Sequence, residues 1–220
     1  MKAPGSSHER ERRQRRESNG GTTTLAAPVS RLGSLQAVTA FLAGTGLLQT
    51  IAALQTSYVQ QNAIGSFICL VAFLHYTWMR DVSDAERIEL RFSDWLVTTP
   101  ALLLELHLLT EQTSRATLVV PVLAVLVMLG LGFGATRAAT RGARAALFGG
   151  ACVAFGVVAG SSLRHAQAEI GIAVAFFGVW SLYAVVAALV EWNASFDIAF
   201  DALDAISKAV FGTWVALKSL

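Results

Sequence analysis

Seven apolar stretches of roughly 20 residues constrain the fold of this chain more than any other feature. A helix needs about 20 consecutive apolar residues to cross the hydrocarbon core of a bilayer. The stretches are continuous rather than alternating, which favours helices over barrel strands, and their short connections predict antiparallel neighbours. The expected helices cover residues 33–54, 61–80, 91–110, 117–136, 144–163, 169–190 and 196–218.

The composition supports an all-α membrane protein, a bundle of seven transmembrane helices. Hydrophobic residues make up 54% of the chain and charged residues only 15%, whereas a soluble domain has about 25% charged residues. This balance disfavours the alternative of a soluble helical bundle. We therefore expect a multi-pass protein of the cell membrane, either plasma or inner membrane.

The chain divides into a tail and one domain. Residues 1–32 are polar and rich in arginine, and we expect a disordered tail there, followed by a seven-helix domain over 33–220. The tail has no apolar stretch of signal-peptide length, which argues against a cleaved secretory signal. Two cysteines, Cys69 and Cys152, lie in apolar stretches; they suggest buried thiols rather than a disulfide framework or a metal site.

Four ionisable residues share one face of the last expected helix, because they are spaced by 4, 3 and 4 residues. They are Asp197, Asp201, Asp204 and Lys208. Ionisable groups are costly inside a membrane, so they are functional hypotheses by default. A purely structural ion pair is the alternative, although a buried pair contributes little net stability. A buried lysine amine can also form a Schiff base with an aldehyde.

The third expected helix carries Arg91, Asp94 and Glu105. Asp94 and Glu105 are separated by 11 residues, which places both carboxyl groups on one helix face, about 16 Å apart along the axis. Two carboxyl groups at different depths suit a proton relay. The alternative is that they only mark the ends of the helix.

Three motifs resemble the microbial rhodopsins. Residues 91–105 (RFSDWLVTTPALLLE) resemble the third helix of that family, and residues 203–212 (LDAISKAVFG) resemble its seventh. Residues 72–80 (AFLHYTWMR) look like the end of the second helix in proteorhodopsins and xanthorhodopsins. The resemblance extends over residues 33–220.

The resemblance implies that Lys208 binds all-trans retinal as a protonated Schiff base. It implies that Asp94 is the main counterion and proton acceptor, Asp204 the second counterion, and Glu105 the internal proton donor. The combination of Asp94, Thr98 and Glu105 is typical of proton pumps similar to proteorhodopsin. A chloride pump would lack the acceptor carboxylate, and a sodium pump would have Asn and Gln in this triplet.

Three further residues are expected to support these groups. By resemblance, Arg91 balances the charges of Asp94 and Asp204, and Thr98 supports the region around Asp94. His75 is expected to hydrogen-bond Asp94, with a histidine facing the lipid head groups as the alternative.

The resemblance also implies a retinal pocket. Trp95 and Trp180 are expected to sandwich the polyene, Tyr183 to reach Asp204, and Leu102 indicates absorption of green light. An interfacial aromatic belt is the alternative for Trp180 and Tyr183. The expected pocket residues are Tyr76, Trp95, Thr99, Leu102, Met128, Gly132, Trp180 and Tyr183.

The sequence departs from the family pattern on two helices. Ala184 and Ala187 stand where the sixth helix usually has a proline and an aromatic residue, which leaves extra room near the ring. Gly149 stands where the fifth helix usually has a tryptophan. In xanthorhodopsin-like proteins, a glycine there opens a side window for an antenna carotenoid. Ordinary packing of a glycine-rich segment is the alternative.

The basic residues favour an inverted orientation. An external N-terminus would place 12 basic residues outside and only Arg115, Arg164 and Lys218 inside, against the positive-inside rule. We therefore expect a cytoplasmic N-terminus. The 12 residues are Lys2, Arg10, Arg12, Arg13, Arg15, Arg16, Arg31, Arg80, Arg87, Arg137, Arg141 and Arg144.

The leading functional hypothesis is a light-driven proton pump rather than an enzyme. It moves protons from the Glu105 side to the Asp94 side, which is inward if the orientation is inverted. The alternatives are a sensory photoreceptor that signals through a partner and a retinal-free membrane carrier. Retinal, protons and lipid are the expected partners, without nucleic acid or metal, and the resemblance implies a homo-oligomer.

Overall fold

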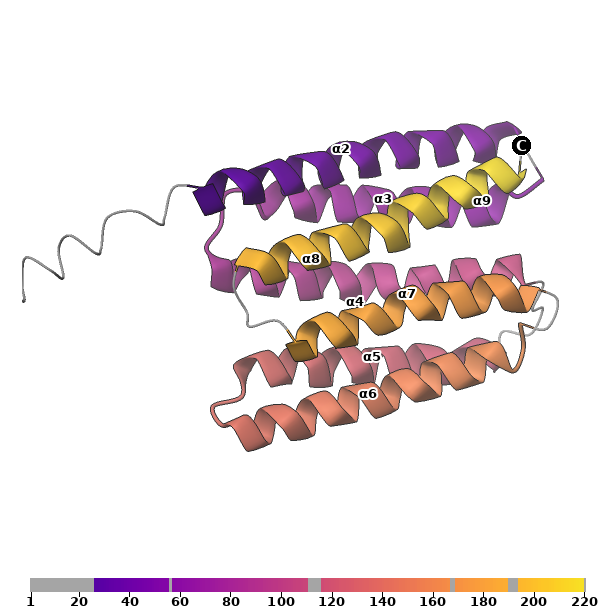
Figure 1. Ribbon diagram of the computed structural model, residues 1–220. Coiled ribbons are helices and arrows are strands. Elements are labelled where there is room, and N and C mark those ends of the chain that lie inside the picture. The colour runs from indigo at the N-terminus through magenta and orange to yellow at the C-terminus, as the bar shows by residue number, and fades with distance from the viewer. Residues whose placement is uncertain (1–25, 56, 111–115, 167–168, 190–193, 220) are drawn as a thin grey trace, which may run out of the picture.

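The computed structural model describes residues 26–55, 57–110, 116–166, 169–189 and 194–219, with the side chains of 26–32 and 194–196 left aside. These residues form seven helices and contain no strand (Figure 1). The seventh helix consists of α8, the π-helical segment η2 and α9, which follow one another without a break. The prediction of an all-α, seven-helix bundle is therefore confirmed. The elements are α2 (Ala26–Gln55), α3 (Val59–Trp78), α4 (Asp84–Leu109), α5 (Ala116–Arg137), α6 (Arg141–Leu163), α7 (Ile170–Leu189), α8 (Ala194–Asp204), η2 (Ala205–Val210) and α9 (Phe211–Ser219).

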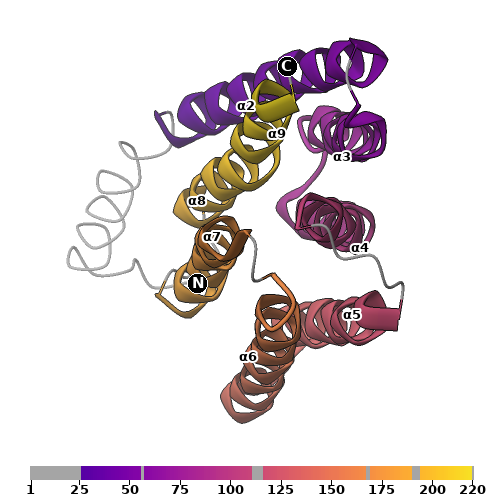
Figure 2. The same ribbon diagram turned by 90° about the vertical axis from the view of Figure 1, so that its right-hand side faces the viewer.

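Seen end-on, the helices surround a common interior (Figure 2). Each of α2 to α6 packs against the next in sequence, and the last helix packs against α2, α3 and α7. Its residues therefore face those of α4 across the bundle. Two apolar clusters fill the interior: one includes Leu103 and Trp180, and the other includes Leu35 and Ala209.

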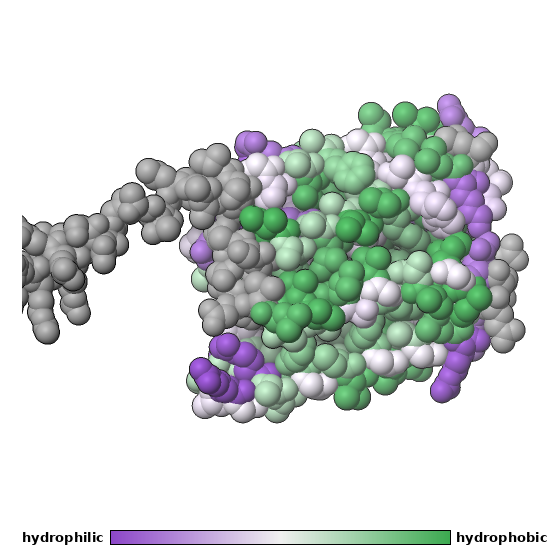
Figure 3. Space-filling model, in the orientation of Figure 1, coloured by the Kyte–Doolittle hydropathy of each residue, from purple (hydrophilic) through white to green (hydrophobic). Residues whose placement is uncertain are grey.

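On the face shown in Figure 3, the surface of the bundle is largely apolar between two more polar ends. Four helices are long and apolar enough to span a membrane on length and composition alone, namely Gly33–Gln55 of α2 together with α5, α6 and α7. By contrast, α4 and the last helix carry ionisable side chains in their interior turns, and these are buried inside the bundle rather than exposed to lipid: Arg87, Arg91, Asp94, Glu105, Asp197, Asp201, Asp204 and Lys208.

The third helix begins seven residues before the expected start at residue 91. Ser83 and Glu86 form a capping box: the Glu86 backbone N–H donates to the Ser83 hydroxyl, and the Ser83 backbone N–H donates to the Glu86 carboxylate. Such reciprocal bonds satisfy N–H groups that lack helical partners. The S-x-x-E pattern was the overlooked sequence signal.

The first helix also begins early. Its backbone is helical from Ala26, so residues 26–32 belong to α2 rather than to the expected tail, and residues 1–25 lie outside the described part. Pro28 lies in the first turn, where a missing N–H removes no helical hydrogen bond.

The last helix is interrupted around Lys208. Residues Ala205–Val210 form a π-helical segment, with Lys208 in its middle. Such segments are rare and occur frequently at functional sites. An uninterrupted helix was expected here, because the sequence pattern of apolar and charged residues does not distinguish a π turn from an α turn.

Candidate functional site

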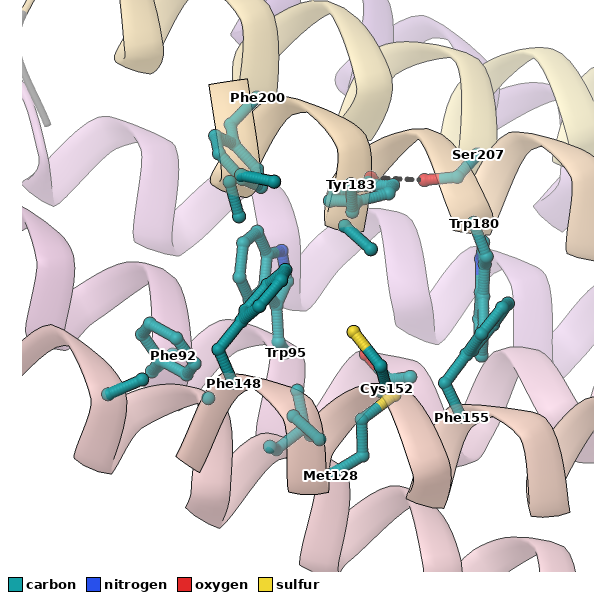
Figure 4. Close-up of a pocket in the computed structure, with 18 of the residues that line it drawn as sticks. Phe92, Trp95, Met128, Phe148, Cys152, Phe155, Trp180, Tyr183, Phe200 and Ser207 are labelled. Carbon is teal, nitrogen blue, oxygen red and sulfur yellow. Dashed lines mark hydrogen bonds between the residues drawn. The ribbon is translucent and has the colours of Figure 1, made fainter. Parts of the chain in front are cut away.

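A cavity of about 410 Å³ lies within the bundle (Figure 4). The side chain of Lys208 is among the groups that line it. Side chains from α4 to η2 line it, and most of them are apolar or aromatic. The lining includes eight of the residues expected to bind or carry the cofactor, namely Trp95, Thr99, Leu102, Met128, Gly132, Trp180, Tyr183 and Lys208. A largely apolar cavity with a few polar groups is typical of a small-molecule site.

Sequence reasoning missed several members of the cavity wall. Apolar helices contain many phenylalanines, and nothing in the sequence distinguishes those that line a cavity from those that face lipid. The missed residues include Phe92, Phe148, Cys152, Phe155, Phe200 and Ser207.

Aromatic contacts hold the two expected tryptophans in place. Trp95 packs edge-on against Tyr183, with ring centroids 5.5 Å apart, and Trp180 packs against Phe176 at 4.6 Å. Such pairs contribute beyond simple burial of area. The walls of the cavity are therefore stiff at the positions of both indole rings.

The two sequence departures have different outcomes. Ala184 and Ala187 line the cavity, so the small side chains widen it. Gly149 is exposed on the outer face of α6 and is absent from the lining, with open space where a Cβ would be. The cavity wall at this level is formed by its neighbour Phe148 and by Cys152.

Lys208 faces two carboxylates. Its Nζ donates a hydrogen bond to Asp94 Oδ2 and lies 3.4 Å from Asp204 Oδ2. All three side chains are almost fully buried. Charges removed from water in this way are stabilised only by close partners, so the amine and the two carboxylates form one electrostatic unit.

Asp204 is held by three neutral donors. The hydroxyl groups of Tyr76 and Tyr183 each donate to its carboxylate at 2.7 Å, and the Trp95 indole N–H donates at 3.0 Å. Tyr76 was expected to line the pocket. Tyr76 is not among the lining residues, and its hydroxyl group instead contacts Asp204, which does line the cavity.

Asp94 has an unused acceptor atom. Its Oδ1 is buried and has no hydrogen-bond partner among the described residues, while Oδ2 accepts from Lys208. Buried acceptors without a partner are rare in proteins. Of the two carboxylates at Lys208, Asp94 is the one that accepts the hydrogen bond from Nζ, whereas Asp204 lies 3.4 Å away.

Arg91 does not balance both carboxylates as expected. Its guanidinium group donates to Asp201 Oδ1 at 2.7 Å and to the Tyr76 hydroxyl at 3.1 Å, and it lies 3.7 Å from Asp204 Oδ2. The described structure contains no ion pair between Arg91 and Asp94. The reason is Asp201, one turn before Asp204, which attracts the guanidinium group away from Asp94.

One further ion pair, between Arg87 and Asp197, extends the cluster of Arg91, Asp201 and Asp204 toward the end of the bundle. Arg87 Nη1 donates to Asp197 Oδ2 at 3.3 Å, and the Ser34 hydroxyl donates to Asp201 Oδ2 at 2.9 Å. The side chain of Arg87 is only 8% exposed. Arg87 therefore belongs to the interior of the bundle. The sequence pattern had instead placed it among the surface charges of a loop.

The hydrogen bond expected between His75 and Asp94 needs correction, whereas Thr98 does contact Asp94, through the backbone of Asp94. The His75 ring nitrogen Nδ1 lies 2.9 Å from the Val71 carbonyl oxygen, and no hydrogen bond joins His75 to Asp94 in the part of the chain described. The Thr98 hydroxyl donates to the backbone carbonyl of Asp94 at 2.9 Å rather than to its carboxylate. Both side chains bond the preceding turn of their own helix, a local alternative that competes with tertiary partners.

Glu105 lies apart from the other ionisable groups. Its side chain is buried, and its carboxyl group accepts a hydrogen bond from Gln49 Nε2 at 3.3 Å. Gln49, from α2, was not identified from the sequence, although an amide side chain in the middle of an apolar helix was the available signal. Asp94 and Glu105 therefore sit in separate environments on the same helix, as a relay with two stations requires.

Comparison with known proteins identifies the fold. A family model described as bacteriorhodopsin-like protein matches residues 28–218, whereas no curated protein gives a match. One similar solved structure is viral rhodopsin OLPVRII (22% identity, TM-score 0.78, covering 86% of this chain and 96% of that one). Another is the light-driven proton pump LR (Mac) from Leptosphaeria maculans (21%, 0.75, 89% and 97%), and a third is bromide-bound halorhodopsin from Halobacterium salinarum (20%, 0.74, 87% and 93%). These matches confirm the resemblance: the chain belongs to the family of bacteriorhodopsin-like proteins, the microbial rhodopsins.

Proposed function

We propose that this protein is a light-driven proton pump that moves protons from the Glu105 side of the bundle to the Asp94 side. Its family binds retinal through a Schiff-base lysine, and light-driven ion transport fits that family. The observation that carries the proposal is the hydrogen bond from Lys208 Nζ to Asp94 at the end of an aromatic cavity.

The cavity suits an elongated apolar aldehyde. It is lined by Trp95 and Trp180, widened by Ala184 and Ala187, and ends at a buried amine. Aromatic faces also stabilise a nearby cation. Retinal bound to Lys208 as a protonated Schiff base would supply light absorption and a light-dependent change in proton affinity at Nζ.

The protein's own residues then provide the path. Asp94 accepts the proton from Nζ, because its Oδ2 accepts the hydrogen bond from that nitrogen. Asp204 stays in place under its three donors and keeps a negative charge beside Nζ. Arg91 and Asp201 form the next polar groups toward the end of the bundle. Glu105 returns a proton from the other side.

Glu105→Gln should slow the recovery of the ground state after a flash by about 10²-fold, the usual contribution of a positioned proton donor. The amide keeps the size of the side chain but has no proton to give. Flash absorption spectroscopy on purified pigment measures this recovery. Glu169→Gln, at an exposed acid on the same side of the bundle, is the matched control. Unchanged recovery in Glu105→Gln would remove the donor role.

A sensory photoreceptor is the second candidate. A sensor requires a long-lived signalling state and no net transport. Glu105 argues against it, because a buried internal donor serves to shorten the photocycle. A photocycle lasting seconds without a light-induced pH change would favour the sensor over the pump.

We also propose an inverted orientation with the N-terminus in the cytoplasm. The exposed arginines of the Asp94 end are Arg80, Arg137, Arg141 and Arg144, against Arg164 and Lys218 at the Glu105 end. Arg87 is buried in an ion pair and drops out of this comparison. The other basic residues do not enter this comparison. Those of the tail up to Arg16, and Arg115, lie outside the described residues, and the side chain of Arg31 is not described.

Protease treatment of intact cells tests the orientation. A tag at the N-terminus should resist external protease, and a tag at the C-terminus should be removed, because an odd number of helices places the two ends on opposite sides. Transport would then run inward. Cleavage of the N-terminal tag alone would rule out the inverted orientation.

Two finer features of the proposal concern partners. An antenna carotenoid could lie on the open outer face of α6 at Gly149, one residue from Phe148 of the cavity wall. The expected evidence is a set of carotenoid absorption bands in the action spectrum of transport, which Gly149→Trp should remove.

We propose a homo-oligomer on the basis of the family resemblance. The molecular mass of the pigment in detergent tests this.

A further inference from the structure

We propose that Gln49 is a positioning residue for the proton donor: it holds Glu105 and stabilises its carboxylate while the proton is away. This inference rests on the proposed function, in which Glu105 is the donor. It assigns a role to a side chain of α2, a helix that contributes no residue to the lining of the retinal cavity.

The structure places the amide N–H of Gln49 against Glu105 and its amide oxygen against Cys69. Nε2 donates to Glu105 Oε1 at 3.3 Å, and Oε1 accepts from the Cys69 thiol at 3.5 Å. Because the thiol donates to the amide oxygen, the amide N–H is presented to the carboxyl group.

The residues around Gln49 are packed closely about its hydrogen bond to Glu105. Gln49 is fully buried, and Glu105 is 1% exposed. Two glycines on neighbouring helices leave room for the amide. A Cβ at Gly65 would collide with Gln49 Nε2 and would lie 2.5 Å from Glu105 Oε1, and a Cβ at Gly212 would lie 2.8 Å from Gln49 Nε2. Residues from α2, α3, α4 and α9 thus converge on one hydrogen bond.

The chemistry of the bond explains why it matters. A protonated Glu105 accepts the amide N–H at its carbonyl oxygen, as a neutral hydrogen bond. Once the proton has left, the same N–H donates to a carboxylate, and a charge-assisted bond is about twice as strong. Gln49 therefore stabilises the state that follows proton release more than the state before it, which speeds the release.

Gln49→Met removes the amide and keeps the length of the side chain. We expect the visible absorption band to stay in place and the recovery of the ground state to slow by roughly tenfold, the loss of one hydrogen bond to a charged group. Sodium azide, a small weak acid that can deliver protons in place of Glu105, should restore much of the rate. Gln55→Met, the same change at an exposed position later in α2, is the control.

A second readout does not depend on turnover. In light-induced infrared difference spectra, the C=O stretch of protonated Glu105 should move to higher wavenumber in Gln49→Met, because its carbonyl oxygen has lost a donor. The band is assigned by its disappearance in Glu105→Gln. Gln49→Asn, which keeps an amide one methylene further away, should give a smaller delay than Gln49→Met.

The possible results separate the two proposals. If Glu105→Gln is slow but Gln49→Met recovers at the normal rate with an unshifted band, the role of Gln49 is refuted and the donor role stands. If Glu105→Gln recovers normally, the donor role itself fails. Loss of pigment in both Gln49→Met and Gln49→Asn would also overturn the inference, because a residue that only positions the donor leaves retinal binding intact.

Discussion

Lys208→Ala should abolish the visible absorption band of the protein completely. The substitution removes the only amine that reaches the cavity within the described residues, since the cavity lining contains one lysine. Retinal without a covalent bond to an amine stays an aldehyde, and its absorption remains in the near ultraviolet. Absorption spectra of purified protein expressed with retinal measure the effect.

The control for this variant is Lys218→Ala. Lys218 lies near the end of α9 and pairs with Glu169 on the surface, away from the cavity. Its removal should leave the band unchanged. A visible band in Lys208→Ala would contradict the assignment of the attachment site, and loss of the band in both variants would point to a folding defect instead.

Asp94→Asn should reduce light-driven transport to background and move the absorption band to longer wavelength. Asparagine has the same shape but accepts no proton, so the transfer from Lys208 Nζ has no destination. The shift has a separate cause: a negative charge in contact with Nζ stabilises a cation localised there, and its removal favours the delocalised excited state. Both effects come from one hydrogen-bonded pair.

Two further variants define this result. Asp94→Glu keeps a carboxyl group and should retain part of the transport. Asp81→Asn, the same substitution at an exposed position of the loop between α3 and α4, should change neither colour nor transport. Full transport in Asp94→Asn would mean that another carboxylate, with Asp204 as the nearest alternative at 3.4 Å, accepts the proton.

The fold could be predicted from the sequence because the bilayer imposes one length scale on every spanning helix. Seven apolar stretches of that length leave little freedom in architecture. The helix ends were less predictable, since they depend on local caps such as the Ser83–Glu86 pair rather than on hydropathy. The π-helical turn at Lys208 was not predictable at all, because it changes the backbone and not the residue pattern.

The candidate site was predictable in its members more than in its contacts. Spacing on one helix predicted that Asp204 lies beside Lys208, and the distance from Lys208 Nζ to Asp204 Oδ2 is 3.4 Å. Contacts between helices depend on which partner lies nearest in space. Arg91 therefore bonds Asp201 rather than Asp94, and the ring nitrogen of His75 bonds the Val71 carbonyl oxygen. Gln49 reaches Glu105 from a helix 56 residues away in sequence, a distance that no spacing rule covers.

The light-induced pH change of intact cells supplied with retinal tests the central claim most directly. Illumination should change the external pH in a sustained way, a protonophore should abolish the change, and Asp94→Asn cells of equal colour should show none. With the inverted orientation, the external medium becomes more alkaline. Well-coloured cells whose external pH stays constant under light would contradict the claim that this protein pumps protons.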